Sequence, residues 1–278
     1  MGRGLLLLAC MLAVAAGARA APISAIDYAR EDRWAAEVVP SLVVGEAVYL
    51  ATPERPRVLA ILTPPSGTPK GWVIVVHGLG VHPDFGMING VRTGVADAGY
   101  STLSVQMPVL AAGASRDDYR EAFPEAGNRI AAAIAYLRRN GASRIAIVSH
   151  SLGASMSNAY LARPDALPID AWVPIGMFGA FAAPPKEAVV DVVAEREIRE
   201  VQESAPGRTP TLPKDACSKQ ITIAGADHYF DTRQPELVAA IVSFLGRAFA
   251  GECRVGQKPP SSALVAPTQS VTFARRPR

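Results

Sequence analysis

Short apolar runs separated by glycine and proline recur along most of the chain. Eight of these runs have the length and the valine and isoleucine content of β-strands. They are residues 43–51, 57–62, 72–76, 101–107, 144–148, 171–175, 189–193 and 220–224. The first two runs predict an antiparallel hairpin, and the others alternate with helical patterns from residue 72 onward. Such alternation predicts parallel strands joined by crossover helices.

Two helical patterns are clear in the second half of the chain. Residues 124–140 place Ile130, Ile134 and Leu137 on one face, with proline in the first turn and glycine just after the end. Residues 235–248 carry a second apolar stripe, with Asp231 or Thr232 available as the N-cap. Both helices are expected to pack on the sheet.

The pattern indicates one α/β domain, residues 21–253, with a mostly parallel central sheet and helices on both faces. No repeat or low-complexity linker divides it. The link between the runs 171–175 and 189–193 is only about a dozen residues long, so we expect no large cap domain. Met177, Phe178 and Phe181 in that link are expected to form either an apolar lip with the 109–123 loop or part of the core.

The chain begins with the features of a secretory signal peptide. Arg3 precedes an uncharged apolar run over residues 4–18, and Ala18-Arg19-Ala20 provides a small-x-small cleavage site. We therefore predict a leader over residues 1–20 and export to the periplasm or the medium. A lipobox ending at Cys10 is the rival interpretation. The run is too short for a transmembrane helix of about 20 residues.

Charge indicates no particular partner. The chain has 28 Lys and Arg against 25 Asp and Glu, and cleavage would remove two arginines, leaving a formal charge of +1. Residues 254–278 contain five basic residues, no acid and several prolines, which predicts a solvated, disordered tail. Five dispersed charges are weak evidence for nucleic-acid binding, so no nucleic-acid partner is expected.

Cleavage would leave two cysteines, Cys217 and Cys253, in an exported chain where disulfides persist. The last strand advances about 20 Å and the last helix returns about 21 Å. Both cysteines should therefore meet at one end of the sheet, and we predict a structural disulfide between them.

A serine at a strand-to-helix turn is the candidate nucleophile. Ser149-His150-Ser151-Leu152-Gly153 follows the run 144–148 and precedes a helix of small residues. Such a turn exposes the hydroxyl of Ser151 above the sheet, with small residues two positions on either side of it. The usual pattern is G-x-S-x-G, and Ser149 replaces its first glycine.

Backbone amides can supply an oxyanion hole near this serine. His77-Gly78-Leu79-Gly80 follows the strand 72–76, and its glycine-rich backbone can direct the Leu79 N–H toward a developing negative charge. The Leu152 N–H, next after the nucleophile and at a helix N-terminus, is the predicted second donor.

A general base and its carboxylate partner follow in the chain. His228 follows the last predicted strand, which delivers it to the same sheet edge as Ser151, and an imidazole exchanges protons near neutral pH. The acid should lie between Ser151 and His228, at the end of the preceding strand. Glu197 occupies the expected position, and Glu195 and Asp191 remain open as alternatives.

The remaining histidines suggest structural roles. We expect His77 to order its own loop and His150 to occupy the variable position before the nucleophile. His77 and His82 could approach a metal with Asp84, but the chain has no H-E-x-x-H pattern, and no metal or cofactor is predicted.

The order of these motifs resembles the α/β-hydrolase superfamily. His77-Gly78, Ser151, Glu197 and the segment 225–228 carry the resemblance, which extends over residues 43–249. It implies the α/β-hydrolase fold. Residues 77–84 and 102–108 resemble a bacterial envelope-associated hydrolase family of uncharacterised function. Aspartate is usual at the position of Glu197, so the extra methylene here requires a shifted backbone.

Together, these residues predict a serine hydrolase that cleaves a carboxylic ester through an acyl-enzyme on Ser151. The expected substrate is a small-molecule or lipid-like ester. Acyl transfer, or cleavage of a thioester or peptide, would use the same triad. A catalytically idle hydrolase fold that binds an envelope component is the competing class.

Overall fold

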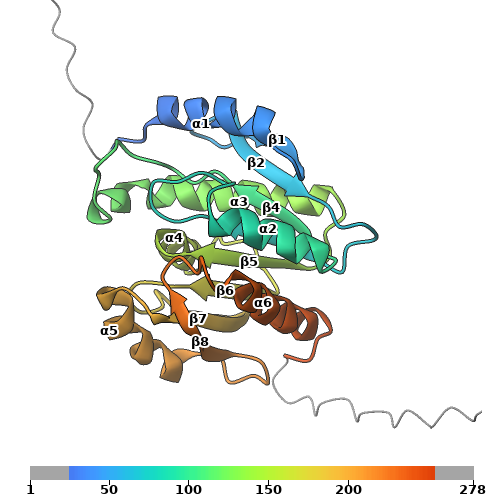
Figure 1. Cartoon of the computed structure of the whole chain (residues 1–278), viewed down its shortest axis with the longest axis vertical. Coiled ribbons are helices and arrows are strands. Elements are labelled where there is room, and N and C mark those ends of the chain that lie inside the picture. Colours follow the sequence, from blue (N-terminus) through green and yellow to red (C-terminus); the bar gives the residue numbers. More distant parts are fainter. Residues whose placement is uncertain (1–24, 254–278) are drawn as a thin grey trace, which may run out of the picture.

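The computed structural model describes residues 25–253, and the predicted leader and tail lie outside this range. Eight strands form one central sheet in the order β1-β2-β4-β3-β5-β6-β7-β8 (Figure 1). The strands are β1 (Glu46–Leu50), β2 (Val58–Thr63), β3 (Trp72–Val76), β4 (Ser101–Val105), β5 (Ile145–His150), β6 (Ala171–Ile175), β7 (Ala188–Arg196) and β8 (Lys219–Asp227).

Strand directions agree with the sequence pattern. β1 pairs antiparallel with β2, which confirms the predicted hairpin, and β2 pairs antiparallel with β4. All pairs from β4 through β3, β5, β6 and β7 to β8 are parallel. The carboxyl ends of these parallel strands therefore meet at one edge of the sheet, where ligands bind in open α/β folds.

Six α-helices surround the sheet within the described range (Figure 1). They are α1 (Tyr28–Ser41), α2 (Met87–Asp97), α3 (Phe123–Arg139), α4 (Leu152–Leu161), α5 (Arg199–Arg208) and α6 (Gln234–Phe249), with 3-10 turns at Asp117–Ala122 and Thr209–Thr211. α3 and α4 share one apolar core with the sheet, and α2 and α6 share a second. The expectation of helices on both faces is confirmed.

Alternation along the central strands explains the two cores. Ile74 and Val76 of β3 pack with α3 and α4, whereas Val73 and Val75 pack with α2 and α6. Successive side chains of a strand point to opposite faces, so a strand buried on both faces is apolar throughout.

Only two residues of helix α1 are buried, Glu31 and Val38. Glu31 accepts hydrogen bonds from Arg129 Nη1 at 3.0 Å and from the Val109 amide at 3.2 Å. Burial raises the pKa of Glu31, although the neighbouring arginines oppose this shift. Polar contacts therefore attach α1 to α3 and to the start of the 109–123 loop.

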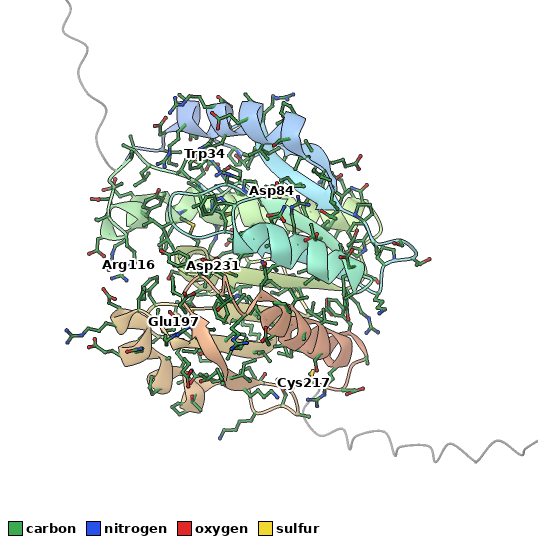
Figure 2. All side chains as sticks on the ribbon, in the orientation of Figure 1. Trp34, Asp84, Arg116, Glu197, Cys217 and Asp231 are labelled. Atoms are coloured by element: carbon green, nitrogen blue, oxygen red, sulfur yellow. A yellow bond between two sulfur atoms is a disulfide. The ribbon has the colours of Figure 1, made fainter. Side chains whose placement is uncertain are left out.

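The two ends of the sheet have different roles. Cys217 precedes β8, Cys253 follows α6, and the two form the predicted disulfide, with Cα atoms 5.0 Å apart. Figure 2 shows Cys217 at the opposite side of the molecule from Glu197 and Arg116. The predicted cap for α6 is wrong: Arg233 is the N-cap, and no side chain caps this helix.

β6 and β7 are joined by residues 176–187, which form neither helix nor strand. No cap domain covers the sheet edge within residues 25–253. In the same range, no helix combines the length and the apolar character needed to cross a bilayer.

Candidate active site

Ser151 lies at a sharp turn between β5 and α4. Its backbone angles, φ 55° and ψ −124°, are ones that a residue with a side chain rarely adopts. The turn requires close approach: a Cβ at Gly153 would lie 2.2 Å from the carbonyl oxygen of His77. Only glycine fits there, which explains the small residue two positions after the serine.

Ser149, where the usual motif has glycine, is accommodated in the core. Its Oγ accepts a hydrogen bond from Trp172 Nε1 at 2.9 Å, and the residue is buried. The indole donor of Trp172 and the hydroxyl of Ser149 thus satisfy each other beneath the turn. The replacement leaves the geometry of Ser151 intact.

The three residues chosen from sequence form one hydrogen-bonded chain. Ser151 Oγ lies 2.9 Å from His228 Nε2, and His228 Nδ1 lies 2.6 Å from Glu197 Oε2. All three side chains are buried or nearly so. In the neutral imidazole, Nδ1–H donates to the carboxylate and Nε2 accepts from the hydroxyl. This arrangement can take a proton from Ser151 and stabilise the imidazolium that results.

Glu197 reaches His228 because β7 ends in an irregularity. The register between β7 and β8 shifts between Ala194 and Arg196, directly before the glutamate. Such a shift re-aims the following side chain. The Ile198 amide then donates to Glu197 Oε2 at 3.2 Å and helps to fix the carboxylate.

The other two candidate acids lie elsewhere. Asp191 is fully buried in an ion pair with Arg208, with Nε–Oδ2 at 2.8 Å. Glu195 is exposed and accepts a hydrogen bond from the Gly225 amide at 2.8 Å. Of the three carboxylates, only Glu197 contacts His228.

Gly176 provides room for the His228 and Glu197 pair. With φ at 56°, a Cβ at this position would lie 2.9 Å from both Glu197 Oε1 and His228 Cε1. Both the backbone conformation and the close approach require glycine. Gly176 follows β6 and belongs to none of the triad motifs, so the order of those motifs in the chain did not indicate that glycine is required here.

Leu79 and Leu152, whose amides are expected to form the oxyanion hole, lie beside the cavity that contains Ser151. Leu79 and Leu152 both contribute to its lining, and a Cβ at Gly78 would lie 3.1 Å from that of Ser151. Leu152 is the first residue of α4, so its amide has no acceptor within the helix. The amide of Ser151 itself donates to the Ile175 carbonyl at 2.8 Å and is not free.

His77 fixes the loop that carries Leu79. Its Nε2 accepts from the Met107 amide at 2.9 Å, and its Nδ1 lies 2.9 Å from the Gly78 carbonyl. Burial lowers the pKa of His77 to about 3, so the ring is neutral. The histidine therefore links the glycine-rich loop to the segment that follows β4.

His150 contacts the triad directly, which its place in the sequence motif did not indicate. Its Nε2 lies 2.8 Å from the His228 carbonyl oxygen, and the centroids of the two rings lie 4.8 Å apart. Burial lowers the pKa of His150 to about 4, and the adjacent His228 acts in the same direction. A neutral His150 that donates through Nε2 holds the backbone of His228 in place.

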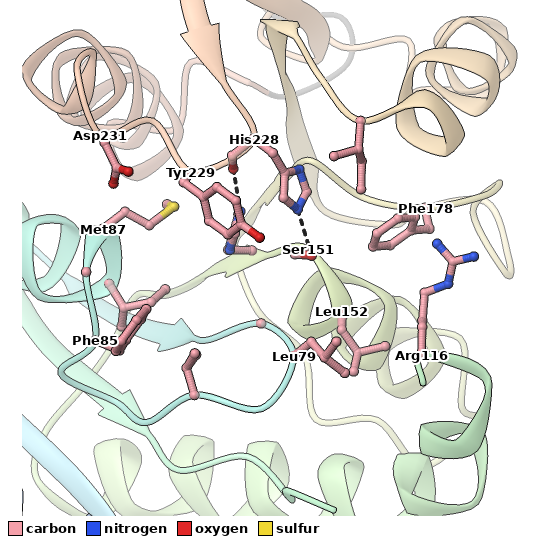
Figure 3. A pocket seen from close by; sticks show the side chains of 16 residues that line it. Leu79, Phe85, Met87, Arg116, Ser151, Leu152, Phe178, His228, Tyr229 and Asp231 are labelled. Atoms are coloured by element: carbon pink, nitrogen blue, oxygen red, sulfur yellow. Dashed lines mark hydrogen bonds between the residues drawn. The ribbon is translucent and has the colours of Figure 1, made fainter. Parts of the chain in front are cut away.

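A cavity of about 420 Å³ opens above Ser151. Figure 3 shows Ser151 at its floor, with Phe85 and Met87 on one side and Phe178 and Arg116 on the other. Phe85 and Tyr229 are 52% and 60% exposed, so the mouth of the cavity is largely apolar. The cavity combines apolar walls with a few polar groups, as small-molecule sites do.

The expected lip is only partly present. Phe178 lines the cavity, and the 109–123 loop contributes Arg116. Met177 is fully buried in the core, and Phe181 packs against Trp172 with ring centroids 5.6 Å apart. Met177 and Phe181 therefore pack in or against the core, as the alternative expectation had it.

The residues considered for a metal have other partners. His82 packs between Trp34 and Phe85, and Asp84 pairs with Arg92. Within residues 25–253, no three histidine, cysteine or acidic side chains form a cluster suited to a metal ion.

Comparisons with known proteins support the fold. No protein-family model and no curated protein sequence matches the chain. A lidless serine hydrolase structure from Xanthomonas campestris matches with TM-score 0.60 at 15% identity, covering 74% of this chain and 95% of that one. Est1E from Butyrivibrio proteoclasticus matches with TM-score 0.58 at 16% identity, covering 74% and 99%.

An esterase from Pyrococcus furiosus matches with TM-score 0.55 at 14% identity, covering 73% of this chain and 90% of that one. The chain therefore has the α/β-hydrolase fold, in a form without a large lid over the described residues. At these identities, the likeness establishes the architecture, and the chemistry must be argued from the site.

Proposed function

We propose that the protein is a serine hydrolase that cleaves a carboxylic ester through an acyl-enzyme on Ser151. The observation that carries the proposal is the hydrogen-bonded chain from Ser151 through His228 to Glu197, at the floor of an open cavity. A serine at a strained turn, a base and a buried carboxylate are the parts that nucleophilic catalysis by serine requires.

The first half-reaction transfers the acyl group to the enzyme. His228 Nε2 takes the proton of Ser151 as its Oγ attacks the ester carbonyl carbon. The negative charge that develops on the carbonyl oxygen is stabilised by the amides of Leu79 and Leu152. The tetrahedral intermediate then collapses, the bond to the alcohol oxygen breaks, and His228 returns its proton to the departing alcohol.

The second half-reaction restores the enzyme. A water molecule gives a proton to His228 and attacks the acyl carbon, and the carboxylic acid leaves as Ser151 recovers its proton. Glu197 stays ionised throughout and stabilises the positive imidazole. The apolar mouth of the cavity favours an ester with an apolar acyl group, including a lipid-like one.

The direct test uses a 4-nitrophenyl ester and a fluorophosphonate probe with the wild type and Ser151→Ala. We expect the wild type to turn over and to be labelled, and the variant to do neither. A folded wild type that is not labelled would contradict the proposal and favour a hydrolase fold used only for binding. Product analysis with an added alcohol separates hydrolysis from acyl transfer.

We also propose that the chain is exported. The disulfide between Cys217 and Cys253 supports this, because such bonds persist in oxidising compartments. Cell fractionation and determination of the mature N-terminus test this proposal. Cleavage after Ala20 is the expected result, and a mature N-terminus at Cys10 would favour the lipoprotein alternative.

A further inference from the structure

A second cavity adjoins the one above Ser151. It has a volume of about 500 Å³ and shares Arg116, Leu152 and Phe178 with the first. A substrate that extends beyond its scissile ester could therefore occupy both cavities. Arg116 is the charged residue that belongs to both.

Arg116 is oriented by an aromatic ring. Its guanidinium lies over Phe178, with 4.2 Å from Cζ to the ring centroid, and Figure 3 shows both side chains beside Ser151 and Leu152. Stacking of this kind restrains the side chain without using its N–H donors. Phe178 in turn packs near the ring of His228, with centroids 6.2 Å apart.

The donors of Arg116 are available. Among the described residues, no carboxylate lies within ion-pair distance of its guanidinium, and no side-chain hydrogen bond involves it. A half-buried guanidinium that is restrained but unpaired is suited to recognise an anionic group of a ligand.

Acidic residues around the cavities are mostly neutralised or distant. Asp117 pairs with Arg120 at 3.1 Å, and Glu203 pairs with Arg199 at 2.7 Å. Glu200 also lines the second cavity and is exposed. Asp231 lies at the opposite end of the first cavity from Arg116, with Ser151 between them (Figure 3). An anionic substrate would therefore place its charge at the Arg116 end.

We infer that the substrate is an ester that carries a carboxylate, and that Arg116 binds this carboxylate. The inference rests on the proposed function and specifies its substrate class. The apolar part of the same substrate fills the cavity beside Phe85 and Met87. Arg116 then both aligns the ester with Ser151 and discriminates against neutral analogues.

The test compares pairs of esters of matched size, one neutral and one anionic. In the first pair, 4-nitrophenyl hexanoate ends in a methyl group, and the mono-4-nitrophenyl ester of adipic acid ends in a carboxylate. A second pair, hexanoates of 4-hydroxybenzoate and of its amide, places the charge in the alcohol part. Spontaneous hydrolysis is measured with Ser151→Ala and subtracted.

We expect kcat/KM of the wild type to favour the anionic ester at least tenfold in one of the two pairs. Arg116→Gln should abolish this preference, and Arg116→Glu should reverse it. The matched control is Arg139→Gln, because Arg139 is exposed at the end of α3 and lines neither cavity. This control should keep the wild-type ratio of the two esters.

Equal kcat/KM values within both pairs, or an unchanged ratio in Arg116→Gln, would overturn the inference. Fluorophosphonate labelling of Ser151 and turnover of the neutral ester report separately on the proposed function. A labelled enzyme that does not discriminate by charge refutes only the role of Arg116. An enzyme that is neither labelled nor active refutes the proposed function itself.

Discussion

Two buried carboxylates, Asp191 within β7 and Glu197 directly after it, are expected to respond differently to loss of their charge. Glu197 contacts His228 at 2.6 Å, whereas Asp191 is paired with Arg208 inside the domain. We therefore compare Glu197→Gln with Asp191→Asn, two substitutions that keep the side-chain shape and remove one negative charge. The first should impair catalysis and the second should impair stability.

The magnitudes follow from what each carboxylate touches. Glutamine at position 197 no longer stabilises the imidazolium and can donate to Nδ1, which favours the wrong tautomer, so kcat should fall by about 10³- to 10⁴-fold. Asparagine at position 191 leaves Arg208 charged and buried, since both side chains of this pair are 0% exposed. Breaking such a pair costs about 3–5 kcal/mol of unfolding free energy.

The assays are ester turnover and thermal unfolding, measured on the same preparations. Glu197→Gln should unfold near the wild-type temperature, and Asp191→Asn should unfold about 10 °C lower while its folded fraction stays active. Glu195→Gln is the control, because Glu195 is exposed and does not contact the triad. If Asp191→Asn were folded but inactive and Glu197→Gln kept activity within tenfold, our assignment of the acid would be wrong.

Three further outcomes are expected. Replacing Cys217 and Cys253 by serine should lower the unfolding free energy by about 4 kcal/mol, because the disulfide closes a loop with a sequence separation of 36. Ester turnover should stay unchanged. Urea unfolding and kcat test these two expectations, and a folded variant without activity would contradict the second. Gly153→Ala should prevent a normal turn at Ser151, because its Cβ would meet the His77 carbonyl at 2.2 Å, and wild-type fluorophosphonate labelling would argue against this. The unfolding free energy should fall as pH drops from about 6.5 toward 4, by about 1.4 kcal/mol per pH unit for each buried histidine. The reason is that the pKa values of His77 and His150 in the folded protein, about 3 and about 4, lie below the pKa of histidine in the unfolded chain. Urea unfolding across this pH range gives the change of unfolding free energy with pH, which should correspond to about one proton fewer in His150→Gln than in the wild type. An equal pH dependence in the two proteins would refute the prediction.

Much of the sheet could be predicted because its strands are apolar on both faces. Residues 72–76 and 171–175 coincide with β3 and β6, and the other six runs overlap strands whose ends differ by a few residues. The motif around Ser151 and the histidine at the end of β8 were recognisable because each follows such a strand. Their convergence follows from the shared edge of parallel strands.

The helix α1 was not predicted, and the buried ion pairs of Glu31 that help to attach it join residues far apart in the sequence. The choice among Asp191, Glu195 and Glu197 depended on the irregular end of β7, which periodicity does not encode. The contact of His150 with the His228 carbonyl joins residues 78 positions apart and leaves no local signal. Burial of Met177 likewise depends on how the link after β6 folds back.

The disulfide also determines how the protein can be handled. It binds the start of β8 to the end of α6, and β8 advances about 25 Å from there to His228. A surface anchor or reporter joined just after Cys253 would therefore be attached on the far side of the domain from Ser151. Immobilised through that end, the molecule would present its reactive serine outward to a flowing solution.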